Sequence, residues 1–282
     1  MKKVLLLVLS ALLPVLAGGQ AQIQTRRYKV SDFNSKVMKV VLGADPMLDA
    51  SLKAAMQDIW HISPYEFSDM GEFESLKKKP DFYFLMVTKS SDGDGSDSSI
   101  RTLTIYKGSA GATDKLSSLL EVVSLPVGSA RSDGRDIVLL PALLSVLQEQ
   151  TQVAISKEIL LGDGVRVTGS GLFKKWDKKV YLCISDLGFE PDDACRQAYE
   201  DDGVVFCDED TIMELTSSRA EGVLVSYCVA PERPVKGSKC YKMLLDPATH
   251  ELYYYDVKTI NPSKEYRFCA QDLKHITSKT KQ

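Results

Sequence analysis

Short apolar runs alternate with amphipathic segments along the first half of the chain, a pattern typical of α/β proteins. Strands are predicted where the runs are continuous or alternating, at residues 37–42, 63–69, 82–87 and 100–106. Helices are predicted where apolar residues recur with helical spacing, at residues 49–60 and 72–79. Along residues 100–106 polar positions alternate with apolar ones, so one side of this strand is expected to face water.

The second half of the chain repeats this order of elements. The strands expected there are residues 179–184, 204–208, 223–229, 239–245 and 251–257, and the expected helices are residues 192–199 and 210–217. Residues 65–69 align with residues 204–208, and Phe73 and Ile212 occupy matching positions in the helices that follow. We therefore expect an ancient duplication, although any two α/β units share some of this pattern.

A long helix and a glycine-rich segment separate the two halves. Apolar spacing predicts a helix over residues 140–158, with Pro141 in its first turn, where proline is tolerated. Residues 162–171 carry four glycines and are interpreted as a hinge. The expected fold is α/β, with two similar units, each a small mixed sheet with flanking helices. The expected divisions are a signal peptide at 1–21, a first unit at 22–134, a connecting helix and hinge at 135–171, and a second, cysteine-containing unit at 172–282.

The first residues have the form of an export signal. Lys2 and Lys3 precede an apolar stretch at residues 4–17, and small residues follow it. Cleavage is expected after Ala21, with Ala17 as the alternative site. Because a bilayer span needs about 20 apolar residues, we favour a cleaved leader over a retained anchor, and expect no transmembrane span in the mature chain. The expected location is the periplasm, the outer-membrane surface or the extracellular space.

Composition and charge agree with a soluble exported protein. The chain has 282 residues, of which 44% are hydrophobic and 26% charged, as in ordinary globular proteins. Its formal net charge of −3 excludes a broadly basic nucleic-acid-binding protein.

All the cysteines lie in the second half. The six are Cys183, Cys195, Cys207, Cys228, Cys240 and Cys269. In an oxidising compartment they are candidates for up to three disulfide bonds, whose pairing the sequence does not specify. The alternative is that several are small buried hydrophobic residues. No C-x-x-C pair is present, so no zinc site is expected.

Several of these segments together resemble a known family. The segment from Asp49 to Trp60 has the form DxxLxxAxxxxW, and it is followed by SPYEF and the aromatic strand at residues 82–87. Late in the chain come the segments KCYKML, ELYYY and DLK. In this order they resemble a family of exported Bacteroidetes proteins that has no assigned function. The resemblance implies export and a two-unit fold, and it brings no catalytic residues.

Motifs of known chemistry are incomplete in this chain. The glycine-rich residues 162–171 lack the Lys-Ser/Thr pair of a phosphate-binding loop, and no G-x-S-x-G nucleophile elbow occurs. Residues 92–97 alternate carboxylates as a calcium loop does, but Asp97 and Leu103 stand where an EF-hand needs glycine and glutamate. We therefore interpret this segment as a solvated hairpin loop. A reactive pair of Cys240 and His250 is possible on one hairpin, but an unpaired thiol is unfavourable outside the cytosol.

Two groups of residues are the candidate binding sites. The acidic cluster Asp208, Glu209 and Asp210 follows a predicted strand, at the sheet edge where α/β proteins bind ligands, and Asp69 occupies the equivalent place in the first unit. These carboxylates could hold a cation, or they could cap the helices that follow them.

Three tyrosines form the second group. Strand alternation places Tyr253 and Tyr255 on one side and Tyr254 on the other. Tyr253 and Tyr255 could form an exposed platform for a partner, or the rings could pack in cross-strand pairs.

These observations favour an exported protein that binds or assembles, without enzymatic activity. Its expected partner is an envelope protein or a small ligand, and the cleft between the two units is the expected place for a ligand. No nucleic acid, cofactor or metal is expected. The alternative is a cation-dependent hydrolase that uses Asp208, Glu209 and Asp210.

Overall fold

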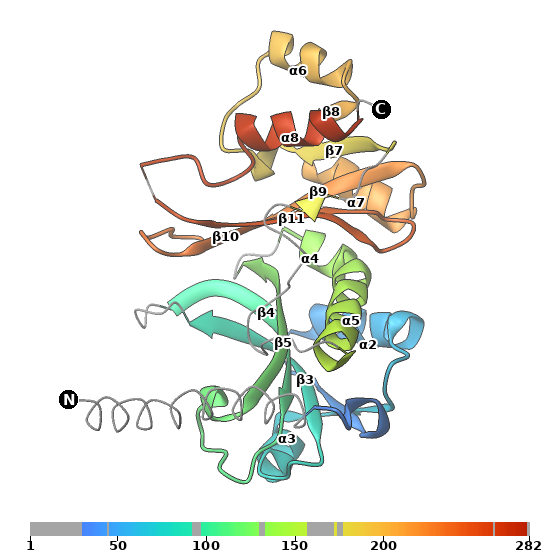
Figure 1. Ribbon diagram of the computed structural model, residues 1–282, viewed down its shortest axis with the longest axis vertical. Helices are drawn as coiled ribbons and strands as arrows, with labels where there is room; N and C mark the ends of the chain where they lie inside the picture. The colour runs from blue at the N-terminus through green and yellow to red at the C-terminus, as the bar shows by residue number, and fades with distance from the viewer. Residues whose placement is uncertain are drawn as a thin grey trace, which may run out of the picture.

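The computed structural model describes most of the chain, at residues 30–43, 45–91, 97–129, 133–156, 172–173, 177–261 and 263–280. The expected signal peptide, the glycine-rich hinge and residues 92–96 of the acidic loop lie outside the described residues. Within the described part, two sheets and their helices form two similar α/β units, which confirms the predicted fold class (Figure 1).

The first unit is built on a five-stranded mixed sheet of order β2-β1-β3-β4-β5. Strand β1 pairs in parallel with β2 and β3, and β3, β4 and β5 are antiparallel neighbours. The strands are β1 (Met38–Val41), β2 (Tyr65–Ser68), β3 (Tyr83–Ser91), β4 (Asp97–Lys107) and β5 (Leu120–Ser129). The helical segments are η1 (Phe33–Ser35), α2 (Pro46–Ile59), α3 (Met70–Leu76) and η2 (Leu116–Ser118).

The second unit contains a sheet of order β6-β11-β10-β9-β7-β8. Its strands are β6 (Leu172–Phe173), β7 (Lys179–Cys183), β8 (Val204–Cys207), β9 (Val223–Val229), β10 (Lys239–Leu245) and β11 (Leu252–Thr259). Its helical segments are η3 (Ile184–Asp186), α6 (Asp193–Glu200), α7 (Glu209–Ser217) and α8 (Ala270–Thr280). The helices α4 (Arg135–Val138) and α5 (Leu140–Ser156) lie at the junction between the units (Figure 1).

Five strands of the second sheet repeat the topology of the first sheet, and β6 is an addition at its edge. In each unit the first strand pairs in parallel with the second and third, and the third, fourth and fifth follow as an antiparallel meander. Thus β7, β8, β9, β10 and β11 repeat β1, β2, β3, β4 and β5, with a helix after each of the first two strands. This is the arrangement that a duplicated unit would have, and the duplication itself stays a prediction.

Matching aspartates begin the equivalent helices. Asp69 accepts a hydrogen bond from the backbone nitrogen of Glu72 at the start of α3, and Asp208 accepts one from Thr211 at the start of α7. Each aspartate has extended backbone angles and satisfies an N–H group that the helix itself leaves unpaired. The residue pattern strand–Asp–helix is therefore the local signal that ends β2 and β8 and begins the next helix.

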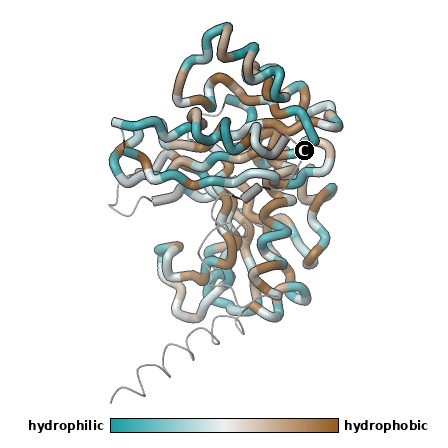
Figure 2. The backbone as a smooth tube through the Cα atoms, turned by 45° about the horizontal axis from the view of Figure 1, so that its top comes forward, coloured by the Kyte–Doolittle hydropathy of each residue, from teal (hydrophilic) through white to brown (hydrophobic). Residues whose placement is uncertain are grey.

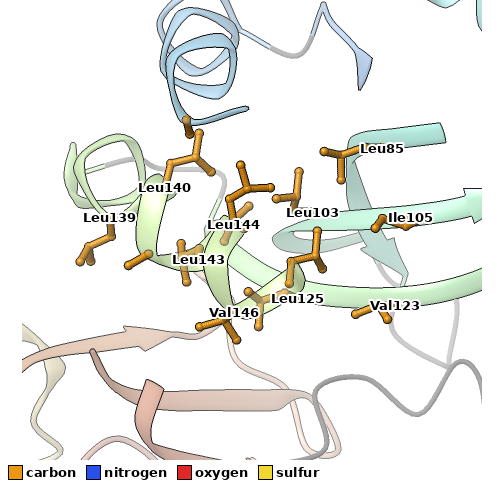
Figure 3. Close-up of a cluster of buried hydrophobic side chains, with 14 of the residues drawn as sticks. Leu85, Leu103, Ile105, Val123, Leu125, Leu139, Leu140, Leu143, Leu144 and Val146 are labelled. Atoms are coloured by element: carbon orange, nitrogen blue, oxygen red, sulfur yellow. The ribbon is translucent and has the colours of Figure 1, made fainter. Parts of the chain in front are cut away.

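One hydrophobic core runs through both units. The face of the first sheet beneath α2 and α5 and the face of the second sheet beneath α7 contribute to the same cluster of buried side chains. On α5, Leu143 and Val146 point toward the strands of the second unit, whereas Leu140 and Leu144 point toward α2 and the first sheet (Figure 3). Figure 2 shows hydrophobic segments along the strands and helices where the units meet.

Each sheet also has an outer core on its opposite face. In the first unit, Phe73 of α3 packs edge-on against Phe84 of β3, with ring centroids 5.0 Å apart. In the second unit, Leu273 and Ile276 of α8 cover the outer face. Within the described residues, no helix is both long enough and apolar enough to cross a bilayer.

Three features of the fold differ from the sequence predictions. Over residues 100–106, strand β4 has no side that is fully exposed to water, because Thr104 and Tyr106 are buried on the α3 side of the sheet. Strand β5 was not predicted, since Pro126 interrupts its pattern; as the edge strand, it tolerates a residue without an N–H group. Helix α8, which covers the second sheet, was not predicted either.

Candidate functional site

A pocket of about 170 Å³ opens where the two units meet. The first unit contributes the end of β5 and the segment around α4. The second unit contributes the carboxyl ends of β7 and β9, the start of α7, and Arg267. Its lining residues are Gly128, Ser129, Asp133, Arg135, Asp136, Ser185, Glu209, Tyr227, Cys228, Val229, Ala230 and Arg267. The pocket therefore exists only when both units are in place.

The position of the pocket follows from the topology of the second sheet. Strands β7, β8 and β9 run in parallel, so their carboxyl ends meet at one edge. Ser185 follows β7, Glu209 follows β8, and Ala230 follows β9. This is the edge at which open α/β sheets bind ligands, because side chains and helix N-termini converge there.

A buried ion pair joins the two units beside the pocket. Arg135 of α4 is 3% exposed, and its Nη1 donates a hydrogen bond to Oδ2 of the fully buried Asp186 at 3.0 Å. Its Nε donates to Asp133 Oδ2 at 2.9 Å, and its guanidinium carbon lies 5.5 Å from the ring centroid of Tyr227. Burial disfavours the charge of Arg135, but Asp186 and Asp133 raise its pKa above the ordinary value, so the cation is held firmly.

Asp186 is itself held by the strand next to it. Its Oδ2 also accepts a hydrogen bond from Ser226 Oγ at 2.7 Å, and Ser226 Oγ in turn accepts one from the backbone nitrogen of Cys183. The carboxylate thus connects the end of β7 with β9. Because Ser226 lies in the middle of β9, this contact fixes the wall of the pocket relative to the sheet.

Further polar contacts cross or flank the junction. Tyr227 Oη on β9 donates to the carbonyl oxygen of Val127 on β5 at 2.8 Å, and burial raises the pKa of this tyrosine well above its usual value. Asp136 forms an ion pair with Arg101 of β4. A Cβ atom at Gly128 would lie 3.2 Å from the Asp136 Cβ atom, so glycine at this position allows α4 to approach β5 closely.

Two charged groups of the pocket are available to a ligand. Arg267 Nη1 donates to the carbonyl oxygen of Ser185 at 2.6 Å, and no carboxylate among the described residues forms an ion pair with Arg267. Burial disfavours the charge of Arg267, yet the neighbouring Cys228, Asp186 and Tyr266 raise its pKa. Glu209 is half-buried in the first turn of α7 and likewise has no ion-pair partner among the described side chains. An anion and a cation could therefore both find partners in this pocket.

Of the acidic residues selected from the sequence, only Glu209 lines the pocket. Asp208 Oδ1 accepts hydrogen bonds from the hydroxyl and the backbone nitrogen of Thr211, at 2.7 and 2.9 Å, and these bonds lower its pKa. Asp69 caps α3 in the same way, and Asp210 is exposed in the first turn of α7. The capping interpretation therefore describes Asp69 and Asp208 better than a cation site does.

The tyrosine platform is corrected by the structure. A β-bulge shifts the register so that Leu244 faces Tyr254 but Leu245 faces Leu252, and Tyr253 is the extra residue. Alternation is lost there, and Tyr253 packs with the outer core that contains Tyr254. Tyr255 is 9% exposed and belongs to the junction core. Tyr253 and Tyr255 therefore do not share an exposed face.

The cysteines and histidines show no catalytic arrangement. The six cysteines are unpaired in this structure, and the closest approach of two sulfur atoms is 3.4 Å, between Cys228 Sγ and Cys240 Sγ; the expected disulfide bonds stay a prediction. Cys240 faces Lys258 at one end of the β10–β11 hairpin and His250 lies in the turn at the other, so they are not a pair. Within the described residues, no three cysteine, histidine or acidic side chains converge as a metal site would require.

The sequence analysis missed Arg135, Asp186 and Arg267. These residues are separated widely along the chain, and their chemistry depends on contacts between the units. One signal was present: Asp186 lies three residues after the end of β7, at the same edge of the sheet as Asp208, which directly follows β8. A charged residue there is expected either to cap a helix or to reach the sheet edge.

Comparisons with known proteins assign no function to the pocket, so its function is inferred from the geometry described above. The resemblance to an exported Bacteroidetes family stays a prediction. No family model, no curated protein and no solved structure matches the sequence.

Proposed function

We propose that this chain is an exported binding protein without enzymatic activity, and that the junction pocket takes a small zwitterionic ligand. One observation carries the proposal. Arg267 and Glu209 have opposite charges, line the same pocket, and form no ion pair with each other or with another described side chain. A ligand with both an anionic and a cationic group would supply the missing partner of each.

The size of the pocket supports a small ligand. Its volume of about 170 Å³ is below the roughly 300–1,000 Å³ of typical sites for drug-sized molecules. A free amino acid, or the end of a peptide with its side chain outside, has the right scale and both charges.

The lining supports binding over catalysis. None of the three histidines lines the pocket. The hydroxyl of Ser185 lies 3.4 Å from Arg135 Nη2 and 3.1 Å from Cys183 Sγ, so it faces a cation and a thiol, and not a general base. The alternative of a cation-dependent hydrolase finds less support, since Asp208 is engaged as a helix cap and Asp210 lies outside the pocket.

Calorimetric titration with three matched probes tests the proposal. Glycine carries both charges, acetate carries only the anion, and methylammonium carries only the cation. Because two partnered charges contribute more than one, we expect glycine to bind at least about tenfold more tightly than either fragment. Arg267→Gln and Glu209→Gln should each abolish that advantage.

Matched controls separate the pocket from general charge effects. Arg233→Gln and Glu214→Gln remove the same charges from exposed positions outside the pocket and should leave glycine binding unchanged. The proposal is wrong if glycine binds no better than acetate and methylammonium, or if the pocket variants retain its full affinity.

A further inference from the structure

Two buried thiols touch each other beside the junction pocket. The Sγ atoms of Cys228 on β9 and Cys240 on β10 lie 3.4 Å apart. Both side chains are enclosed, with exposures of 8% and 0%. Cys228 lines the pocket, whereas Cys240 lies behind it in the outer core of the second sheet.

The register of the strands explains the contact. In the antiparallel pair, Val229 faces Tyr241 and Cys228 faces Lys242. Cys228 and Cys240 are therefore diagonal neighbours on one face of the sheet, which places both side chains among the residues beneath α8. The backbone ladder thus holds both thiols on the same face of the sheet, with their sulfur atoms already in contact.

We propose that Cys228 and Cys240 are joined by a disulfide bond in the exported protein, and that this bond ties β9 to β10 at the wall of the pocket. The inference rests on the export that is part of the proposed function, because export brings the chain to an oxidising compartment. It assigns one pairing among the fifteen that six cysteines allow.

The bond forms by thiol–disulfide exchange with a disulfide-bearing oxidant, such as glutathione disulfide or an exported thiol oxidoreductase. One cysteine thiolate attacks a sulfur of the oxidant, forms a mixed disulfide and releases the first oxidant thiolate. The other cysteine thiolate then attacks the protein sulfur and expels the second. Two electrons pass to the oxidant, and the two protons released by the cysteines are taken up by its thiolates.

The order of events follows from burial. Contact with Cys240, together with burial, raises the pKa of the Cys228 thiol well above its usual value, so the reactive thiolate is scarce in the folded protein. An oxidant also has little access to thiols that are 8% and 0% exposed. The bond is therefore expected to form while the hairpin of β9 and β10 is still open, during folding after export.

The other thiols have different surroundings. Cys183 and Cys207 are in register on the parallel strands β7 and β8, but their sulfurs contact Ser185 Oγ at 3.1 Å and the Leu182 carbonyl oxygen at 3.7 Å. Cys195 lies on α6, and its thiol is partly exposed. Among the six cysteines, all of which the structure describes, no other two sulfur atoms form a hydrogen-bond contact.

Peptide mapping of the refolded full chain tests the pairing. The reduced, unfolded protein is refolded in a buffer of reduced and oxidised glutathione, alkylated, and digested with trypsin without reduction. Because trypsin cleaves after Lys236 and Lys239, Cys228 and Cys240 fall in different peptides and only a disulfide bond holds them together. We expect this linked pair to be the predominant disulfide product, and Cys240→Ser to abolish it and leave Cys228 alkylated.

Cys195→Ser is the matched control and should leave the linked pair unchanged. The inference is overturned if Cys228 is alkylated in most of the refolded wild-type chain, or if it is linked mainly to another cysteine. Since the wild-type chain gives the decisive result, the test does not depend on the folding of a variant. Glutathione supplies the oxidant regardless of export, and glycine titration of the same sample tests the pocket, so the two proposals fail separately.

Discussion

Removing one partner of the buried pair Arg135–Asp186 should weaken the whole protein. In Arg135→Met, the fully buried Asp186 would retain Ser226 as a hydrogen-bond donor but lose its counter-ion. An uncompensated buried charge of this kind costs about 3–5 kcal/mol in the free energy of unfolding. Asp186→Asn keeps the shape of the side chain and leaves the Arg135 cation with Asp133 alone, so it should also be destabilising.

The double variant Arg135→Met/Asp186→Asn separates the coupling energy of the ion pair from the effects of the two single substitutions. It removes both charges, and the asparagine can still accept from Ser226 Oγ. We expect it to be more stable than Arg135→Met alone, because residues in direct contact show coupling energies of about 0.5–3 kcal/mol. Urea unfolding followed by far-UV circular dichroism measures all four proteins of this cycle.

A surface ion pair between the same two units is the control. Arg219 Nη2 lies 2.6 Å from Asp58 Oδ2, and both side chains are more than half exposed. Asp58→Asn should therefore cost no more than about 1 kcal/mol. If Arg135→Met costs as little as Asp58→Asn, burial does not govern the strength of this pair and the reasoning is refuted.

Four further changes test the fold locally. Asp69→Ala should lower the free energy of unfolding by about 1 kcal/mol, and Asp208→Ala should lower the urea midpoint too, because each removes a helix cap. Gly108→Ala would place a Cβ atom against the Lys79 carbonyl oxygen and should cost about 1–3 kcal/mol. Burial opposes the charge of Asp272, but hydrogen bonds from buried neighbours lower its pKa. The contribution of its carboxylate to the free energy of unfolding is therefore complete above about pH 4 and is lost as the pH falls. Asp272→Asn should make the stability depend less steeply on pH in this acidic range.

Three of these changes have an informative comparison. Asp210→Ala removes an exposed carboxylate that is not the helix cap and should lower the midpoint less than Asp208→Ala. Gly111→Ala meets only the Ser109 hydroxyl, at 3.9 Å, and should be tolerated. If Asp210→Ala lowered the urea midpoint as much as Asp208→Ala, the capping role of Asp208 would be contradicted. If Gly111→Ala were as destabilising as Gly108→Ala, the steric explanation for Gly108 would be contradicted. If the stability of Asp272→Asn fell with decreasing pH as steeply as that of the wild type, the role assigned to Asp272 would be contradicted.

The sequence predicted most elements because their signals are local. Strands β9 and β10 were predicted with the bounds that they have, since each is an apolar run between turn residues. Strand β5 escaped notice because Pro126 and Gly128 weaken its pattern, and its partners come from elsewhere in the sheet. Its position at the edge, which a single sequence does not reveal, is what makes Pro126 acceptable.

The pocket was predictable in place but not in composition. The rule that ligands bind at the carboxyl ends of parallel strands led to Glu209, which does line it. Arg135 and Arg267 come from segments before α5 and before α8, and nothing in the spacing of the residues brings these segments together. The tyrosines show the reverse case: alternation is a reliable local rule, but one bulged residue at Tyr253 reverses it.

The shared core of the two sheets has a consequence for how the molecule comes apart. Because Leu143 and Val146 of α5 pack within one cluster that reaches both sheets, neither half can be lost without exposing the other's interior to water. Heating should accordingly give one calorimetric transition, whose van't Hoff and calorimetric enthalpies agree. A fragment that ends at residue 156 should be aggregation-prone, since it would expose the apolar side chains that the second unit covers in the whole chain.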